Sequence, residues 1–130
     1  MLDTLRTVLL DDESLTAVIS NRVDPFNLSE GGNAALPAVF YTVDDETPLQ
    51  TMTASSMKVA LVNYTAFSTT LAQSEEVADL VVDVLDDYSD SGTNITHCRC
   101  VERSRETVEP IAGSEDYFYS TTLLFQVWYE

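Results

Sequence analysis

Side chains able to act as a general base or a nucleophile are scarce in this sequence. His97 is the single histidine, and it lies within residues 95–102, a run that reads as a strand. No serine or cysteine near it stands in the glycine-flanked setting of a nucleophile elbow. Ser14, Ser55 and Ser104 lack that setting as well. Catalysis by a triad is therefore not expected, and we interpret His97 as a solvent-facing or edge-strand residue.

Adjacent carboxylates are the one feature compatible with acid–base chemistry. A hydrolase that uses paired acids needs one carboxyl group in an apolar pocket, where burial raises its pKa. The pairs instead fall in segments that read as loops or as the solvated face of a helix, so no catalytic residue is predicted. A small acidic carboxylate-dependent hydrolase stays open as an alternative. The pairs are Asp11-Asp12, Asp44-Asp45, Glu75-Glu76 and Asp86-Asp87.

Metal and cofactor sites are not predicted either. Residues 86–90 lack the glycine and the terminal glutamate of a calcium loop. Gly31-Gly32 is not followed by the Gly-Lys-Ser/Thr of a phosphate loop. Cys98 and Cys100 face the same side of a strand, with Cα atoms near the ~7 Å limit for a disulfide. A closed zinc site would need two copies of the chain, so we interpret both thiols as small, half-buried residues.

Charge is the strongest departure from average composition. The 130 residues include 22 acidic and 6 basic ones, for a formal net charge of −16. Such a surface repels nucleic acid phosphates and anionic lipids. Two explanations stay open. One is adaptation to high salt, where the Debye length falls to about 3 Å; the other is a partner of opposite charge.

Length and hydropathy indicate a globular protein outside the membrane. The hydrophobic share of 45% is ordinary for a folded domain. No run reaches the ~18 apolar residues that a bilayer span needs. Residues 1–4 lack the basic and apolar regions of a signal peptide. We therefore expect synthesis in the cytoplasm and no membrane partner.

Helical spacing of apolar residues appears in two segments. Residues 2–20 have a Leu-rich stripe that predicts an N-terminal helical segment. Residues 69–88 predict one long amphipathic helix. Ser68 or Thr69 is expected to cap its N-terminus, and Asp90-Ser91-Gly92 is expected to end it with a glycine.

Apolar and aromatic runs predict the strands. The run at residues 57–67 is apolar on both faces, which is typical of a central strand. Residues 44–56 and 103–116 are polar and read as long loops or arms. We therefore predict a single α+β domain over residues 1–130, with an antiparallel sheet of about four strands flanked by the two helical segments. The expected strands are residues 38–43, 57–67, 95–102 and 117–129.

Aromatic residues are dense near the C-terminus. About half of them are expected in the sheet core, and the rest lie on the second face of the last strand. Uncovered aromatics are enriched at protein contacts, and an exposed apolar face is a liability unless a partner covers it. Self-assembly is the simplest way to cover such a face. The predicted subunit or partner interface comprises Tyr117, Phe118, Tyr119, Trp128, Tyr129, Pro48, Leu49 and Met52.

The order and spacing of these segments resemble the tail-terminator (tail-completion) proteins of long-tailed bacteriophages and related archaeal viruses. No catalytic fingerprint contributes to the resemblance. The matching segments are the Leu-rich opening helix, the strand start Arg22-Val23, the strands Leu36-Pro37-Ala38-Val39-Phe40-Tyr41 and Val59-Ala60-Leu61-Val62-Asn63-Tyr64, the helix from Ser68 to Tyr88, and the closing Phe125-Gln126-Val127-Trp128-Tyr129-Glu130.

The resemblance implies a non-enzymatic virion protein of the neck. Such a subunit forms a hexameric ring that caps the tail tube, ends its polymerisation and joins the tail to the head connector. Its partners would be copies of itself, the tail tube protein and the connector or stopper protein. DNA would pass through the lumen without specific binding, and the loops 44–56 and 103–116 would be contact arms. A head–tail stopper or adaptor ring of the same neck is the nearest alternative.

Overall fold

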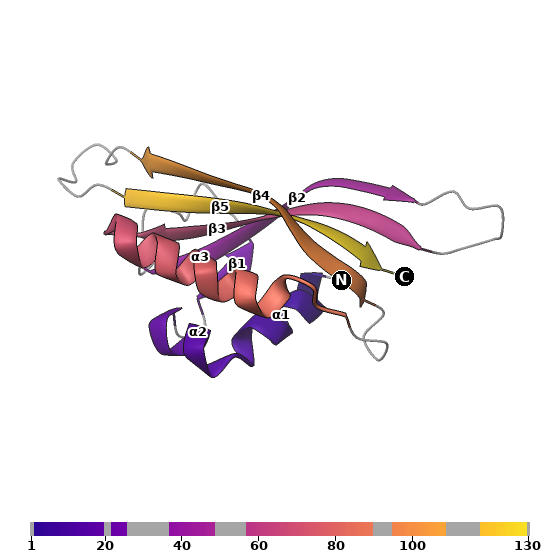
Figure 1. Cartoon of the computed structure of the whole chain (residues 1–130), viewed down its shortest axis with the longest axis horizontal. Helices are drawn as coiled ribbons and strands as arrows, with labels where there is room; N and C mark the ends of the chain where they lie inside the picture. Colours follow the sequence, from indigo (N-terminus) through magenta and orange to yellow (C-terminus); the bar gives the residue numbers. More distant parts are fainter. Residues whose placement is uncertain are drawn as a thin grey trace.

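A mixed sheet and a layer of helices on one of its faces make up the described part of the chain (Figure 1). The computed structural model describes residues 2–19, 22–25, 37–48, 57–89, 95–108 and 118–129; at 47–48, 107–108 and 118 it describes the backbone alone. The elements are α1 (Leu2–Leu10), α2 (Glu13–Ile19), β1 (Val23–Pro25), β2 (Ala38–Pro48), β3 (Lys58–Ser68), α3 (Leu71–Leu85), β4 (Ile95–Val108) and β5 (Phe118–Tyr129).

The sheet has five described strands in the order β1-β2-β3-β5-β4. The junctions among β2, β3, β5 and β4 are antiparallel, as predicted. The predicted set of about four strands did not include β1, although the resemblance included a strand start at Arg22-Val23. β1 pairs parallel to β2, with Val23 opposite Val39. Three residues are too few to show the alternation that identifies a strand in a sequence. The central position of β3 is confirmed, since it pairs with β2 on one side and β5 on the other.

Two strands extend further than predicted. β2 continues to Pro48 and β4 to Val108, so residues 44–48 and 103–108 belong to strands and not to loops. Backbone pairing with β3 and β5 explains this, because a polar edge segment gains ladder hydrogen bonds whatever its side chains are. The remainder of the two predicted loops, residues 49–56 and 109–116, lies outside the described residues.

The ends of α3 also differ from the prediction. Thr70, and not Ser68 or Thr69, is the N-cap, because its side chain accepts a hydrogen bond from the Gln73 N–H at 3.2 Å. The helix ends at Leu85. Asp87 then adopts a φ of 61°, so an aspartate takes the left-handed turn that the prediction gave to a later glycine. Aspartate tolerates this conformation better than most residues do.

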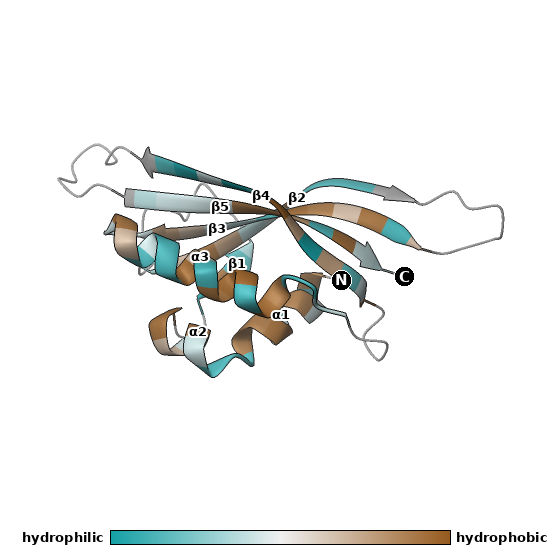
Figure 2. Cartoon of the chain, in the orientation of Figure 1, coloured by the Kyte–Doolittle hydropathy of each residue, from teal (hydrophilic) through white to brown (hydrophobic). Residues whose placement is uncertain are grey.

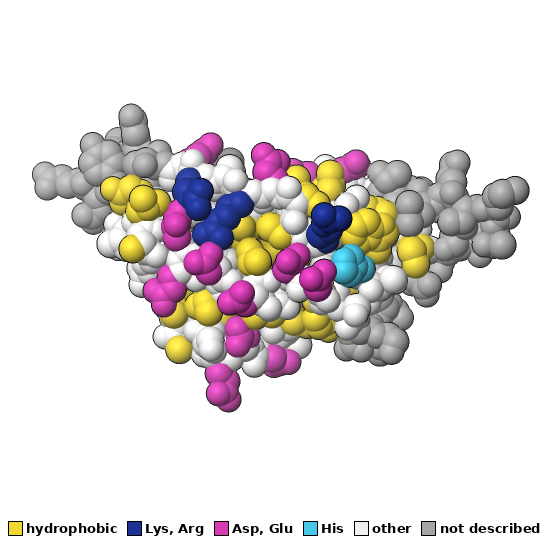
Figure 3. Space-filling view, viewed as in Figure 1, with side chains coloured by type: hydrophobic (Ala, Val, Ile, Leu, Met, Phe, Trp, Pro, Cys, Tyr) yellow, Lys and Arg dark blue, Asp and Glu magenta, His cyan; other side chains and the backbone are white. Residues whose placement is uncertain are grey.

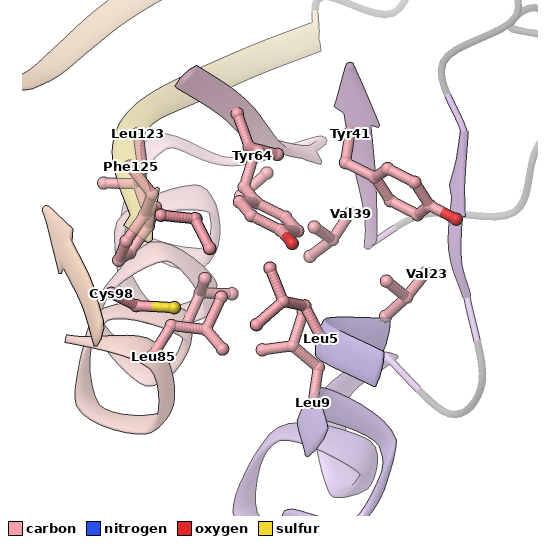
Figure 4. Packing of buried hydrophobic residues seen from close by; sticks show 14 of the residues in the cluster. Leu5, Leu9, Val23, Val39, Tyr41, Tyr64, Leu85, Cys98, Leu123 and Phe125 are labelled. Carbon is pink, nitrogen blue, oxygen red and sulfur yellow. The ribbon is translucent and has the colours of Figure 1, made fainter. Parts of the chain in front are cut away.

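The core lies between the helices and the sheet. Figure 4 shows Leu5 and Leu9 of α1 pointing toward Val39 and Tyr64 of the sheet. Figure 2 shows the matching brown stripes on the helices. The largest fully buried side chains are Tyr64, Phe125, Leu5, Leu9, Leu15, Ile19, Leu85, Ile95, Leu123, Val23, Val39 and Val62.

Candidate functional site

One face of the sheet carries no described helix, and its central strands present both apolar and polar residues there. α1, α2 and α3 all lie on the opposite face (Figure 1). Along β3 the buried residues alternate with half-buried ones, so the half-buried set points away from the helices. We call this surface the open sheet face. Its apolar members, all half-buried, are Phe40, Val59, Leu61, Phe67, Leu124 and Trp128.

A hollow of about 190 Å³ lies in the middle of the open sheet face. Thr65 and Thr122 contact each other in it, with hydroxyl oxygens 3.2 Å apart. The Asn63 amide donates a hydrogen bond to Asp44 at its margin. The lining residues, Phe40, Thr42, Asn63, Thr65 and Thr122, include no general base or activated nucleophile.

His97 lies on an edge strand, as predicted, because β4 ends the described sheet. Its ring packs on Trp128 with centroids 5.6 Å apart. Its Nε2 atom is 3.7 Å from Oδ1 of Asp87, a carboxylate that is largely exposed. An exposed pair of this kind contributes little to stability. The arrangement orients His97 on an aromatic surface, and among the described residues its side chain contacts Trp128 and Asp87.

The two thiols are unsuited to nucleophilic chemistry. Both are free, with Cys98 buried and Cys100 half-buried. Burial raises the pKa of Cys98 to about 12 and also raises the pKa of Cys100. Since the thiolate is the reactive form, both side chains remain protonated and unreactive at neutral pH. Within the described residues, no group of three or more His, Cys, Asp or Glu is placed to hold a metal ion.

Most of the few basic side chains bind partners inside the chain. Arg103 donates to Asp79 at 2.6 Å, and Arg105 pairs with Glu75. Two others bind backbone carbonyls, since Arg6 Nε donates to the Val23 carbonyl and Arg22 Nε donates to the Pro37 carbonyl. The side chains of Lys58 and Arg99 have no described partner.

The visible surface is acidic as a result. In Figure 3 the visible Lys and Arg side chains lie along β4, and acidic ones are spread over the helices. On the face seen in Figure 3, the basic side chains are interspersed with acidic ones and form no basic patch for binding phosphates.

The predicted interface residues are only partly brought together. Trp128 and Tyr119 are half-buried, and Trp128 lies on the open sheet face. Tyr129 is 8% exposed and belongs to the core, where its hydroxyl donates to Glu46. The side chains of Phe118 and Pro48, and the whole of Tyr117, Leu49 and Met52, lie outside the described residues.

The sequence reasoning left several open-face residues out of the interface. Phe40 and Phe67 form an edge-to-face pair there with ring centroids 5.5 Å apart. Leu61 and Leu124 also belong to this face. The sequence pattern did indicate these residues, because β3 and β5 have apolar residues at both odd and even positions. One helix layer covers only one of those two faces.

Comparisons with known proteins found a match in fold. No protein-family model and no curated protein matches the sequence. A chain in a solved structure described as "Virion of native gene transfer agent (GTA) particle" matches with a TM-score of 0.66 at 15% identity. The match covers 97% of this chain and 91% of that chain. At this identity the likeness establishes a shared fold. None of the described helices is both long and apolar enough to span a membrane.

Proposed function

We propose that this chain is a structural subunit of a virus-like particle and that it has no catalytic role. The observation that carries the proposal is the fold shared with a chain of a virion structure over 97% of the present chain. The open sheet face supports the proposal, because a surface with two phenylalanines and a tryptophan is typical of a subunit contact.

The specific role that we propose is a ring in the neck of the particle. Six copies would cap the tail tube, end its polymerisation and join it to the head connector, with DNA passing through the lumen. The net charge of −16 suits such a channel, since a surface with a large excess of acidic groups repels DNA phosphates. Both the order of the elements in the sequence and the fold support this assignment over the hydrolase alternative.

Light scattering after size-exclusion chromatography tests whether the chain assembles. We expect a mass near six times the 14.4 kDa of one chain, reached more completely in high salt. Trp128→Ser combined with Leu124→Ser should lower the fraction of ring, because the changes remove apolar area from the open sheet face. Leu71→Ser is the matched control, since Leu71 is 47% exposed on the helix side. A strict monomer at every salt concentration contradicts the proposal.

Imaging of intact particles tests the position in the neck. A label attached to this chain should appear where the tail meets the head. A label along the tail or on the capsid contradicts the neck assignment and leaves the structural role standing.

A further inference from the structure

Within the described residues, each edge of the sheet is covered over only part of its length. On one edge, β1 covers β2 at residues 39–41. On the other, the turn after α3 covers β4 at Cys98. There the Asp87 N–H donates to the Cys98 carbonyl at 2.8 Å, and the Cys98 N–H donates to the Tyr88 carbonyl at 2.9 Å. The Cys100 N–H is also satisfied, by the Asp86 carboxylate at 3.0 Å.

Beyond the turn, β4 directs backbone groups outward with no described partner. Cys98 shows that residues whose side chains face the helices turn their N–H and C=O away from β5. Arg103 and Arg105 face the helices too, because they pair with Asp79 and Glu75 of α3. Their N–H and C=O groups therefore also point outward. We call residues 102–108 the open β4 segment.

β2 has an equivalent stretch. The Val39 N–H points away from β3, because it donates to the Arg22 carbonyl at 2.9 Å. Glu46 lies on the same helix-facing side, opposite Ala60 and in contact with Tyr129. Its N–H and C=O therefore point outward as well. No described strand pairs with this edge of β2 beyond residue 41. We call residues 42–48 the open β2 segment.

The two open segments lie at opposite ends of opposite edges. In Figure 1 the arrowheads of β2 and β4 point to the two ends of the molecule. The strand order makes β4 antiparallel to β2 in direction. A second copy in the same orientation, displaced along the strands, therefore brings its β2 antiparallel to β4 of the first. Both copies then keep their helices on the same side of the sheet.

We propose that the open β4 segment of one copy pairs antiparallel with the open β2 segment of a second copy. This inference rests on the proposed ring and names the surface that closes it. The contact joins two different surfaces of the subunit, so it repeats from copy to copy. The copies form a closed ring when the rotation between neighbours adds up to a full turn. The displacement along the strands is the stagger that a curved, closed sheet requires. A second copy fits better than a foreign strand, because the chain itself presents both complementary segments.

The same segments explain why the contact must depend on salt. Asp44 and Asp45 lie on the open β2 segment, and Glu102 and Glu106 lie on the open β4 segment. Pairing brings these like charges together, which salt screens. The bulge between Val43 and Asp45 and the missing N–H of Pro48 also keep the ladder short. We therefore expect free subunits in low salt and rings in high salt.

A proline at Arg105 tests the pairing directly. Arg105→Pro removes an N–H that points away from β5, so the subunit should still fold, while the ring should be lost. Arg105→Gln is the matched control, since it also breaks the ion pair with Glu75 but keeps the N–H. Circular dichroism should show the same fold for both. A ring that persists in a folded Arg105→Pro variant overturns the inference and leaves the proposed function intact.

Hydrogen exchange gives an independent measurement on the unmodified protein. On assembly, amides within residues 102–108 and within residues 42–46 should both become protected. Protection of the β4 segment alone indicates β4–β4 pairing or a foreign strand, and overturns the inference. A ring without protection of either segment does the same. A chain that forms no ring at any salt concentration overturns the proposed function as well.

Discussion

Cys98 illustrates how burial sets the chemistry of a single residue. It lies in the core near Leu85 and Phe125 (Figure 4). Burial raises its pKa from 9.0 to about 12. The folded protein thus retains a proton that the unfolded chain releases at lower pH. The stability that depends on this proton is fully present below pH 9.0 and is lost as the pH rises toward about 12.

Replacement of Cys98 should therefore flatten the alkaline loss of stability. As the pH rises above 9.0, the urea midpoint of the wild type should fall more steeply than that of Cys98→Ala. The pKa of Tyr64 is raised first by burial and second by charge on Cys98, so the replacement also removes this second cause and flattens the alkaline loss in the same direction. Cys100→Ala serves as the control, since its half-buried thiol should contribute less. Equal slopes for the wild type and Cys98→Ala contradict the assigned cause.

For single residues, the sequence predicted which side of a strand a residue occupies better than it predicted contacts. Spacing alone indicated that Cys98 and Cys100 share a side of one strand and lack a ligand set. Tyr129 was assigned to an interface by its residue type. Alternation with Phe125 and Val127 places Tyr129 on the same side as these two core residues. Position within the strand was the better guide.

The cap of α3 shows how one hydrogen bond positions an element. Thr70 has extended backbone angles and accepts from the Gln73 N–H. The same turn is held by Ser68, whose hydroxyl donates to Oε1 of Gln73 at 2.6 Å. α3 packs against β3 and β5, and its Glu75 and Asp79 carboxylates accept hydrogen bonds from the arginines of β4. A weaker cap should therefore lower the stability of the whole helix layer.

Thr70→Ala should destabilise the fold by about 1 kcal/mol, the usual cost of losing an N-cap side chain. Thr69→Ala is the matched control, because Thr69 is exposed one residue earlier and does not cap the helix. Urea denaturation of both variants measures the difference. Equal losses for the two variants contradict the role of Thr70.

The lengths of the elements were harder to predict than their existence. Apolar alternation located β3 and β5 nearly end to end, because both are half core. Residues 44–48 and 103–108 are strand because they extend the pairing with residues 58–61 of β3 and 118–123 of β5. Local composition does not contain that information. The open edges, and hence the proposed copy-to-copy pairing, became visible only with the strand order.

For the whole molecule, net charge is the dominant property beyond the fold. The formal charge is −16. Arg6, Arg22, Arg103 and Arg105 each bind a group within the chain, so they offset few of the exposed acids. Self-repulsion of this kind destabilises a compact state, and salt relieves it.

Sodium chloride should therefore raise the melting temperature of the isolated subunit. Glu76→Gln combined with Asp83→Asn should reduce this salt dependence, because both carboxylates are exposed on α3. Thr96→Asn, an exposed neutral change, should leave the dependence unaltered. Scanning calorimetry across a salt series of Arg105→Pro, which should stay monomeric, separates this effect from assembly. A melting temperature that does not change with salt contradicts the assignment.

The strand order also affects how the chain folds during its synthesis. β5 lies between β3 and β4, although β4 is translated first. Until the ribosome has released β5, β4 lacks its only neighbouring strand in the described sheet, and one side of β3 is bare. Early cooperative folding of the sheet is therefore prevented. The nascent chain exposes β-prone segments until late in translation, the stage at which chaperones would be most useful to it.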